Sequence, residues 1–175
     1  MSLLLALSVG FSATGQMKFS LATEKQQYRM GEPIKLAWRL YNGTNQSWVV
    51  YRADVGVREN FPQITFSIEG PSGRHTLSLL GDEKATTLDA CRLPPGQTLQ
   101  TNFDLTEWAA YLDYRIPPGK YGISATFAHA ARESRGILKG QPVARCGSAG
   151  PATKAQPAEI WDGTLTAPQI SFTVQ

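Results

Sequence analysis

The sequence predicts an all-β fold, an antiparallel β-sandwich of about seven to eight strands with long loop insertions. Short runs in which apolar and polar residues alternate recur from Met17 to the end of the chain, and this periodicity is typical of half-buried strands. Sixteen glycines and 11 prolines separate these runs, as expected of turn-rich β-proteins. With 175 residues, of which 18% are charged, the chain has the size and composition of one globular domain.

The clearest predicted strand follows Pro33, where apolar residues at every second position would share one face. Further strands are expected at residues 48–52, 63–69, 75–79, 98–105, 120–127 and 169–174. Residues 42–46 have the length and composition of a hairpin loop between the first two strands, and residues 70–73 those of a turn between the next two. One core between two sheets should contain Ile34, Leu36, Trp38, Leu40, Phe66, Phe103, Tyr121, Ile123, Phe127, Ile170 and Phe172.

The tripeptide Pro-Pro-Gly occurs twice, ending at Gly96 and at Gly119. Proline fixes φ and the following glycine takes a positive φ, which together favour a type II turn before a strand. Between the two turns, residues 106–114 have helical spacing, so a short helix is expected there. Its Trp108 and Tyr111 are candidates either for closing the end of the sandwich or for contacting a partner.

Residues 3–11 form an apolar run that is too short for a transmembrane helix. Small residues at Ala13 and Gly15 are typical of a signal-peptidase site, and cleavage would leave Gln16 as the first mature residue. Alternatively, the same stretch alternates with a period of two and would form an N-terminal strand, its own or one donated to a neighbouring copy. We therefore interpret residues 1–15 as a signal-peptide remnant or an alternative N-terminal strand, and residues 16–175 as one domain.

The chain contains only two cysteines, Cys91 and Cys146, both in turn-rich polar surroundings. In an exported protein, an even pair of cysteines predicts a disulfide. A metal site that combines them with His75 and His129 is the alternative, but the spacing matches no common zinc motif. The sequence therefore predicts a disulfide, no metal site and no cofactor, in a periplasmic, cell-surface or extracellular protein.

Residues 129–160, which we call the excursion, form the longest stretch without strand periodicity and contain no Phe, Tyr or Trp. Their five basic and two acidic residues account for the whole formal net charge of +3. A loop of this length inside a compact domain is usually functional or disordered. We expect either a solvated loop held by Cys146 or a loop that contacts a partner, and the candidate partner-binding residues are Arg132, Arg135, Lys139 and Arg145.

The pattern Tyr28-x-x-Gly31-Glu32-Pro33-Ile34, the two Pro-Pro-Gly turns and the later phrase Trp161-Asp162-Gly163 resemble bacterial immunoglobulin-like domains. Among named families, the chain is similar to the BsuPI-type proteinase inhibitors over residues 17–127 and the last strand. The resemblance implies an immunoglobulin-like β-sandwich, and it does not carry protease inhibition over to this chain, for which inhibition stays an alternative function. It assigns no reactive-loop residue, because the matching phrases specify turns and strand starts.

The sequence offers little support for catalysis or nucleic-acid binding. His75 and His129 belong to no recognisable nucleophile or general-base motif, there is no glycine-rich phosphate loop, and basic residues do not cluster with aromatic ones. Asn42 and Asn45 each begin an N-glycosylation triplet, which we interpret as turn chemistry.

The predicted function is therefore a non-catalytic exported binding module, or an accessory subunit of a cell-envelope assembly, with a protein partner. Two alternatives remain. One is a filament or surface-layer subunit that donates residues 3–13 as a strand and self-assembles through it. The other is a proteinase inhibitor.

Overall fold

The computed structural model describes residues 15–51, 63–78, 90–107, 115–129, 143–147 and 159–175. These residues form eleven strands and a short helical segment at residues 105–107. The strands are β1 (Met17–Thr23), β2 (Gln27–Tyr28), β3 (Lys35–Asn42), β4 (Trp48–Tyr51), β5 (Gln63–Gly70), β6 (Gly73–Ser78), β7 (Ala90–Leu93), β8 (Thr98–Asp104), β9 (Gly119–His129), β10 (Glu159–Ile160) and β11 (Gly163–Val174).

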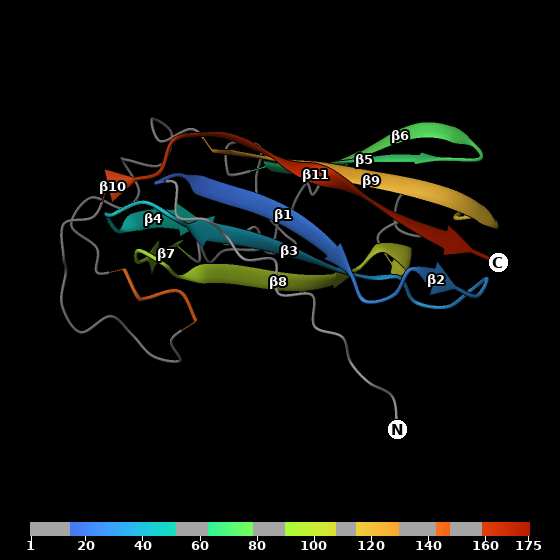
Figure 1. The fold of residues 1–175 in the computed structure, drawn as a ribbon, viewed down its shortest axis with the longest axis horizontal. Helices are drawn as coiled ribbons and strands as arrows, with labels where there is room; N and C mark the ends of the chain where they lie inside the picture. Colours follow the sequence, from blue (N-terminus) through green and yellow to red (C-terminus); the bar gives the residue numbers. More distant parts are fainter. Residues whose placement is uncertain (1–14, 52–62, 79–89, 108–114, 130–142, 148–158) are drawn as a thin grey trace, which may run out of the picture.

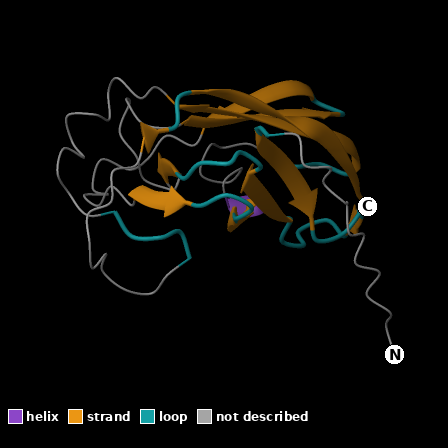
Figure 2. Cartoon of the chain, turned by 60° about the vertical axis from the view of Figure 1, so that its left-hand side comes forward, coloured by secondary structure: helices purple, strands orange, loops and turns teal. Residues whose placement is uncertain are grey.

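The strands form two facing sheets and a third, smaller one (Figures 1 and 2). One layer has the order β1-β3-β8 and the other the order β2-β11-β9-β5-β6. The small sheet, with the order β10-β4-β7, lies at the end of the sandwich opposite β2 and the C-terminus. All pairings between longer strands are antiparallel, whereas the two-residue strands β2 and β10 pair in parallel with β11 and β4. The predicted antiparallel β-sandwich is confirmed, although the described residues form eleven strands instead of the expected seven to eight.

The predicted core is also confirmed. Of its eleven members, all but Phe103 and Ile170 are buried, and these two pack partly buried against the same cluster. The burial of β3 alternates strictly, with Leu36, Trp38 and Leu40 at 1% exposure or less. Alternation has this effect because successive side chains of a strand point to opposite faces of the sheet.

The expected hairpin through residues 42–46 is wrong, although strands lie on both sides of it. β3 pairs with β1 and β8, whereas β4 pairs with β7 and β10. The β4–β7 ladder instead continues the β3–β8 ladder, and residues 43–47 and 94–97 interrupt this two-stranded ribbon. By contrast, β5 and β6 form the predicted hairpin around Pro71 and Ser72.

The two Pro-Pro-Gly turns differ. Gly96 has a φ of 70°, and the Gln97 N–H donates to the Pro94 carbonyl at 3.2 Å, as a type II turn requires. Gly119 has a φ of 153° and is already the first residue of β9, so the second predicted type II turn is wrong. A side chain at Gly119 would overlap the ring of Pro71, so this glycine permits close approach of the β5–β6 turn.

The helical segment begins at Leu105, one residue before the predicted start. Asp104 precedes it, and the Oδ1 atom of Asp104 accepts a hydrogen bond from the Thr106 N–H at 2.8 Å. Residues 108–114, with the candidate residues Trp108 and Tyr111, lie outside the described residues.

Candidate functional site: the small sheet and its disulfide

Two stretches of the excursion are described, and they lie along opposite edges of the small sheet. Residues 143–147 run beside β7, where the Arg92 N–H donates to the Ala144 carbonyl at 2.7 Å and the Cys146 N–H donates to the Arg92 carbonyl at 2.9 Å. On the other edge, β10 pairs in parallel with β4. Both edges of the small sheet are therefore occupied by backbone from the excursion.

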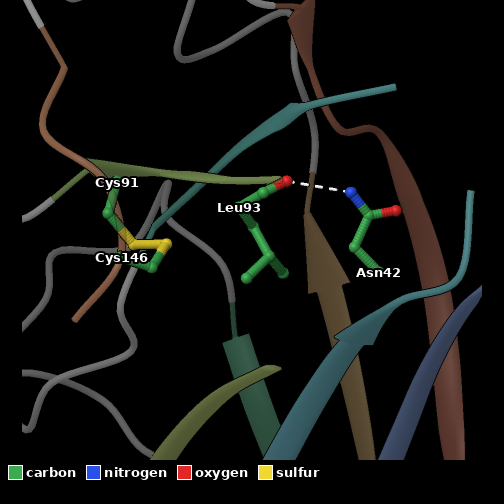
Figure 3. Close-up of a disulfide and its surroundings, with 4 residues drawn as sticks. All are labelled: Asn42, Cys91, Leu93 and Cys146. Atoms are coloured by element: carbon green, nitrogen blue, oxygen red, sulfur yellow. Dashed lines mark hydrogen bonds between the residues drawn. A yellow bond between two sulfur atoms is a disulfide. The ribbon is translucent and has the colours of Figure 1, made fainter. Parts of the chain in front are cut away.

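The predicted disulfide joins Cys91 to Cys146, with an S–S distance of 2.07 Å and a Cα–Cα distance of 4.8 Å (Figure 3). It links β7 covalently to residues 143–147, beside the hydrogen bonds described above. The expectation that Cys91 lies in a polar turn is wrong, because Cys91 belongs to β7 and is 2% exposed. The strand was missed because it has only four residues, too few for alternation to stand out.

Asn42 connects the small sheet to the first layer and is completely buried. Its Nδ2 atom donates to the Leu93 carbonyl on β7 at 2.8 Å (Figure 3). The same atom also donates to the Gln46 carbonyl in the loop at 2.8 Å. Its Oδ1 atom accepts from the N–H and the hydroxyl of Thr44 at 3.0 and 2.7 Å. These hydrogen bonds connect the β3–β8 ladder to the β4–β7 ladder at the point where the two ladders are interrupted. The interpretation of Asn42 as turn chemistry rather than as a glycan acceptor agrees with this geometry, because a glycan would have to occupy the buried Nδ2 atom.

Arg92 and Arg145 are partners in a parallel bridge on the outer edge of β7. Arg145 is exposed and Arg92 is half-buried, with its Nε atom fully buried. Of the four basic residues predicted to bind a partner, Arg145 is therefore placed at the small sheet. Arg132, Arg135 and Lys139 lie outside the described residues. Arg92 was not among the residues predicted from the sequence, because only its pairing with Arg145 in the folded chain places it next to the excursion.

An ion pair lies at the end of the first layer that is farther from the small sheet. Lys35 Nζ lies 2.9 Å from Asp104 Oδ2. Burial raises the pKa of Asp104, but hydrogen bonds from Lys35 and from backbone N–H groups outweigh burial and hold this pKa below its usual value. The hydrogen bond to Asp104 raises the pKa of Lys35. This ion pair links the first residue of β3 to the last residue of β8.

In the described part of the chain, no group of three or more His, Cys, Asp or Glu side chains is placed to bind a metal ion. His75 is half-buried on β6, and His129 is the last residue of β9. No helix among the described residues is long and apolar enough to cross a membrane.

No protein-family model matches the sequence, and no curated protein matches it either. Among solved structures, the chain is similar to Spo0M, a sporulation control protein from Bacillus subtilis, with a TM-score of 0.40 and 9% identity over 93% of this chain and 50% of that one. The chain thus spans half the length of that protein. It is also similar to the CARDB domain of the PF1109 protein from Pyrococcus furiosus, solved in complex with di-metal ions, with a TM-score of 0.40 and 8% identity over 94% of this chain and 97% of that one.

Proposed function

We propose that this protein is a non-catalytic exported binding module that contacts a protein partner through the small sheet and the excursion it carries. The observation that carries the proposal is the attachment of the excursion to both edges of the small sheet. On one edge the attachment consists of the Cys91–Cys146 disulfide and backbone hydrogen bonds, and on the other of the β10–β4 pairing. In this proposal the sandwich is a scaffold, and the binding residues lie in a loop, as is common in β-sandwich proteins.

Attachment of the excursion at two points favours binding for a physical reason. A free loop loses conformational entropy when it becomes ordered against a partner, and that loss weakens association. Anchoring residues 143–147 and β10 to the sheet removes part of this loss before the partner arrives. The excursion also contains the whole formal net charge of the chain, so it would attract acidic surfaces and speed association with them.

The disulfide supports the proposed location. Disulfides persist in oxidising compartments and are rare in the cytosol. Export to the periplasm, the cell surface or the medium fits this requirement, and an accessory subunit of an envelope assembly would work there.

The experiment is affinity capture from envelope and secreted fractions of the source organism, using the intact protein as bait. The expected result is a recurrent co-purifying protein that is lost when four basic residues of the excursion are replaced by serine. A matched control removes four exposed basic residues from other parts of the sandwich and should leave capture unchanged. The test variant changes Arg132, Arg135, Lys139 and Arg145, and the control changes Arg29, Arg39, Arg74 and Lys120.

Three outcomes would contradict the proposal. If both variants fold and capture the same protein equally, the excursion is not the contact, and Trp108, Tyr111 or the N-terminal strand becomes the better candidate. If the captured protein is a protease that the module inhibits in a titration, the BsuPI-type inhibitor is the better function. If native material begins before residue 3 and the captured protein is the same chain, the donated-strand filament is favoured; a chain that begins at Gln16 excludes it.

A further inference from the structure

The outer face of the five-stranded sheet carries mainly hydroxyl side chains. Along β5, β9 and β11, the residues that alternate with the buried core residues point to this face and are mainly serine and threonine. Pairing between the strands arranges them in rows across the sheet, one of which contains Thr65, Thr126 and Thr166. We call this surface the hydroxyl face, and its serines and threonines are Thr65, Ser67, Thr76, Ser124, Thr126, Thr164, Thr166, Ser171 and Thr173.

These hydroxyl groups are accessible and are not used within the fold. All nine residues are exposed or half-buried, and no hydrogen bond joins their hydroxyl groups to another of the described residues. The outer face of the first layer differs, because there the side chain of Gln100 accepts a hydrogen bond from Arg39 and donates one to Asn102. A hydroxyl group that the chain leaves to solvent can exchange water for a ligand at little cost.

An amide group lies on the same face. The β11–β9 pairing is irregular between Ala167 and Ile170, and Gln169 lies within this irregularity. The amide of Gln169 reaches the position that a side chain at Gly122 of β9 would take. It therefore lies across the sheet, where it adds donors and an acceptor next to Ser171, the residue paired with Gly122. Bulges re-aim side chains in this way beside functional sites.

The centre of the hydroxyl face is uncharged. Among the described residues, the charged side chains of this face are Glu69, Arg74 and Lys120, which lie toward the end that contains the β5–β6 turn and the C-terminus (Figure 1). Glu69 and Arg74 pair with each other. The described part of this face also presents no aromatic side chain. Protein interfaces are enriched in aromatic residues and arginine and depleted in serine, so the composition of this face is not that of a protein interface.

We propose that the hydroxyl face binds a neutral polysaccharide that lies across β5, β9 and β11. The hydroxyl groups of a sugar chain both donate and accept hydrogen bonds, and so do those of serine and threonine, whose protons rotate to suit the partner. An uncharged surface fits an uncharged ligand, because neither side has to remove an ion from water. This surface is separate from the small sheet, and the proposal does not depend on the function proposed above.

The spacing of the hydroxyl groups favours an extended ligand. Neighbouring residues of a row are about 4.8 Å apart, and successive outward residues of a strand are about 6.7 Å apart. One sugar chain can therefore contact several of these groups at once. Each hydrogen bond gained in exchange for water contributes little by itself, so binding needs many of them together.

The test is NMR titration of the intact, oxidised protein with three uncharged hexasaccharides, namely cellohexaose, laminarihexaose and mannohexaose. A hexasaccharide is long enough, since three neighbouring strands span about 10 Å. Hexagalacturonate serves as the charged control. The expected result is a saturable shift of the backbone amide resonances of β5, β9 and β11 with at least one uncharged hexasaccharide, and weaker binding of hexagalacturonate to this face.

Variants test which groups bind. Replacing Thr65, Thr126 and Thr166 together by valine removes three hydroxyl groups of one row but keeps the β-branched shape, and should weaken binding at least tenfold. Gly122→Ala removes no polar group but would displace the amide of Gln169, and should weaken binding about two- to tenfold. A matched control makes the same valine replacement at three threonines of the first layer and should leave binding unchanged. The control variant changes Thr23, Thr98 and Thr101.

Several results would overturn the inference. These are the lack of a saturable shift with all three uncharged hexasaccharides, shifts confined to other parts of the sandwich, and equal binding by the folded valine variant of the hydroxyl face. Tighter binding of hexagalacturonate to this face would also contradict a neutral ligand. Shifts of the same residues on raising the protein concentration alone would assign the face to a second copy of the chain. Should the valine variant fail to fold, Gly122→Ala and the shifts of the wild type still decide the matter.

Discussion

Replacing Asn42 by alanine should destabilise the fold more than its position next to a surface loop suggests. The side chain is 0% exposed and makes four hydrogen bonds, to Leu93, Gln46 and twice to Thr44. It is the side chain that bridges the break between the two ladders of the β3–β8 and β4–β7 ribbon. Its removal would leave the small sheet without this connection to the first layer.

The magnitude follows from what happens to each partner. Gln46 is exposed and Thr44 is half-buried, so water can replace the lost hydrogen bonds there, at about 0.5 to 1 kcal/mol each. Leu93 is completely buried, and a carbonyl left without its donor in such a place costs about 1 to 3 kcal/mol. Together these effects give a loss of about 2.5 to 6 kcal/mol in the free energy of unfolding. For a domain of this size, that corresponds to a fall in melting temperature of roughly 5 to 24 °C.

The assay is urea unfolding of the Asn42→Ala and Asn45→Ala variants, with tryptophan fluorescence as the signal that reports unfolding. Asn45 lies three residues later in the same loop, begins the other glycosylation triplet and is exposed, so its replacement should change stability by less than about 0.5 kcal/mol. Asn42→Asp should also be destabilising, because a carboxylate oxygen would face the Leu93 carbonyl in place of a donor. A loss below about 1 kcal/mol for Asn42→Ala, or equal losses for both alanine variants, would refute the reasoning.

Three further predictions concern stability. Trp38→Ala should cost about 3 to 5 kcal/mol in urea unfolding, because this completely buried ring would leave a cavity between the sheets; a loss below about 1 kcal/mol would mean that the ring is not in the core. Thiol labelling of unfolded, unreduced protein should detect no free thiol, and replacing Cys91 and Cys146 together by serine should cost up to about 4 kcal/mol, given a separation of 55 residues. Two labelled thiols would contradict the disulfide. The pKa of Asp104 is lowered in the folded state. The ionised Asp104 therefore stabilises the fold at pH values above its unfolded pKa, and this stabilisation is lost as the pH falls through its folded pKa. The difference in free energy of unfolding between wild type and Asp104→Asn, measured by urea unfolding, should shrink on acidification. A difference independent of pH would contradict the assigned pKa shift.

Local features were predictable from the sequence for most strands long enough for alternation to repeat, although β1 was not among the expected strands. The burial of Leu36, Trp38 and Leu40 and the turn at Gly96 depend on side-chain periodicity and on proline and glycine, which are local properties. Gly119 was misinterpreted because its role depends on contact with Pro71, far away in the sequence.

Sequence alone determined the class of fold, most of the core and the pairing of the two cysteines, because apolar alternation and an even cysteine count hold whatever the topology. Only the tertiary structure decided that β4 pairs with β7 instead of β3, that Asn42 is a buried connector, and that Arg92 lies beside Arg145. Strand order and register depend on contacts between residues that are distant in the chain, and several registers satisfy the same local pattern. The candidate site consists of such contacts, since Arg92 and Arg145 come from separate segments and meet only when residues 143–147 align with β7.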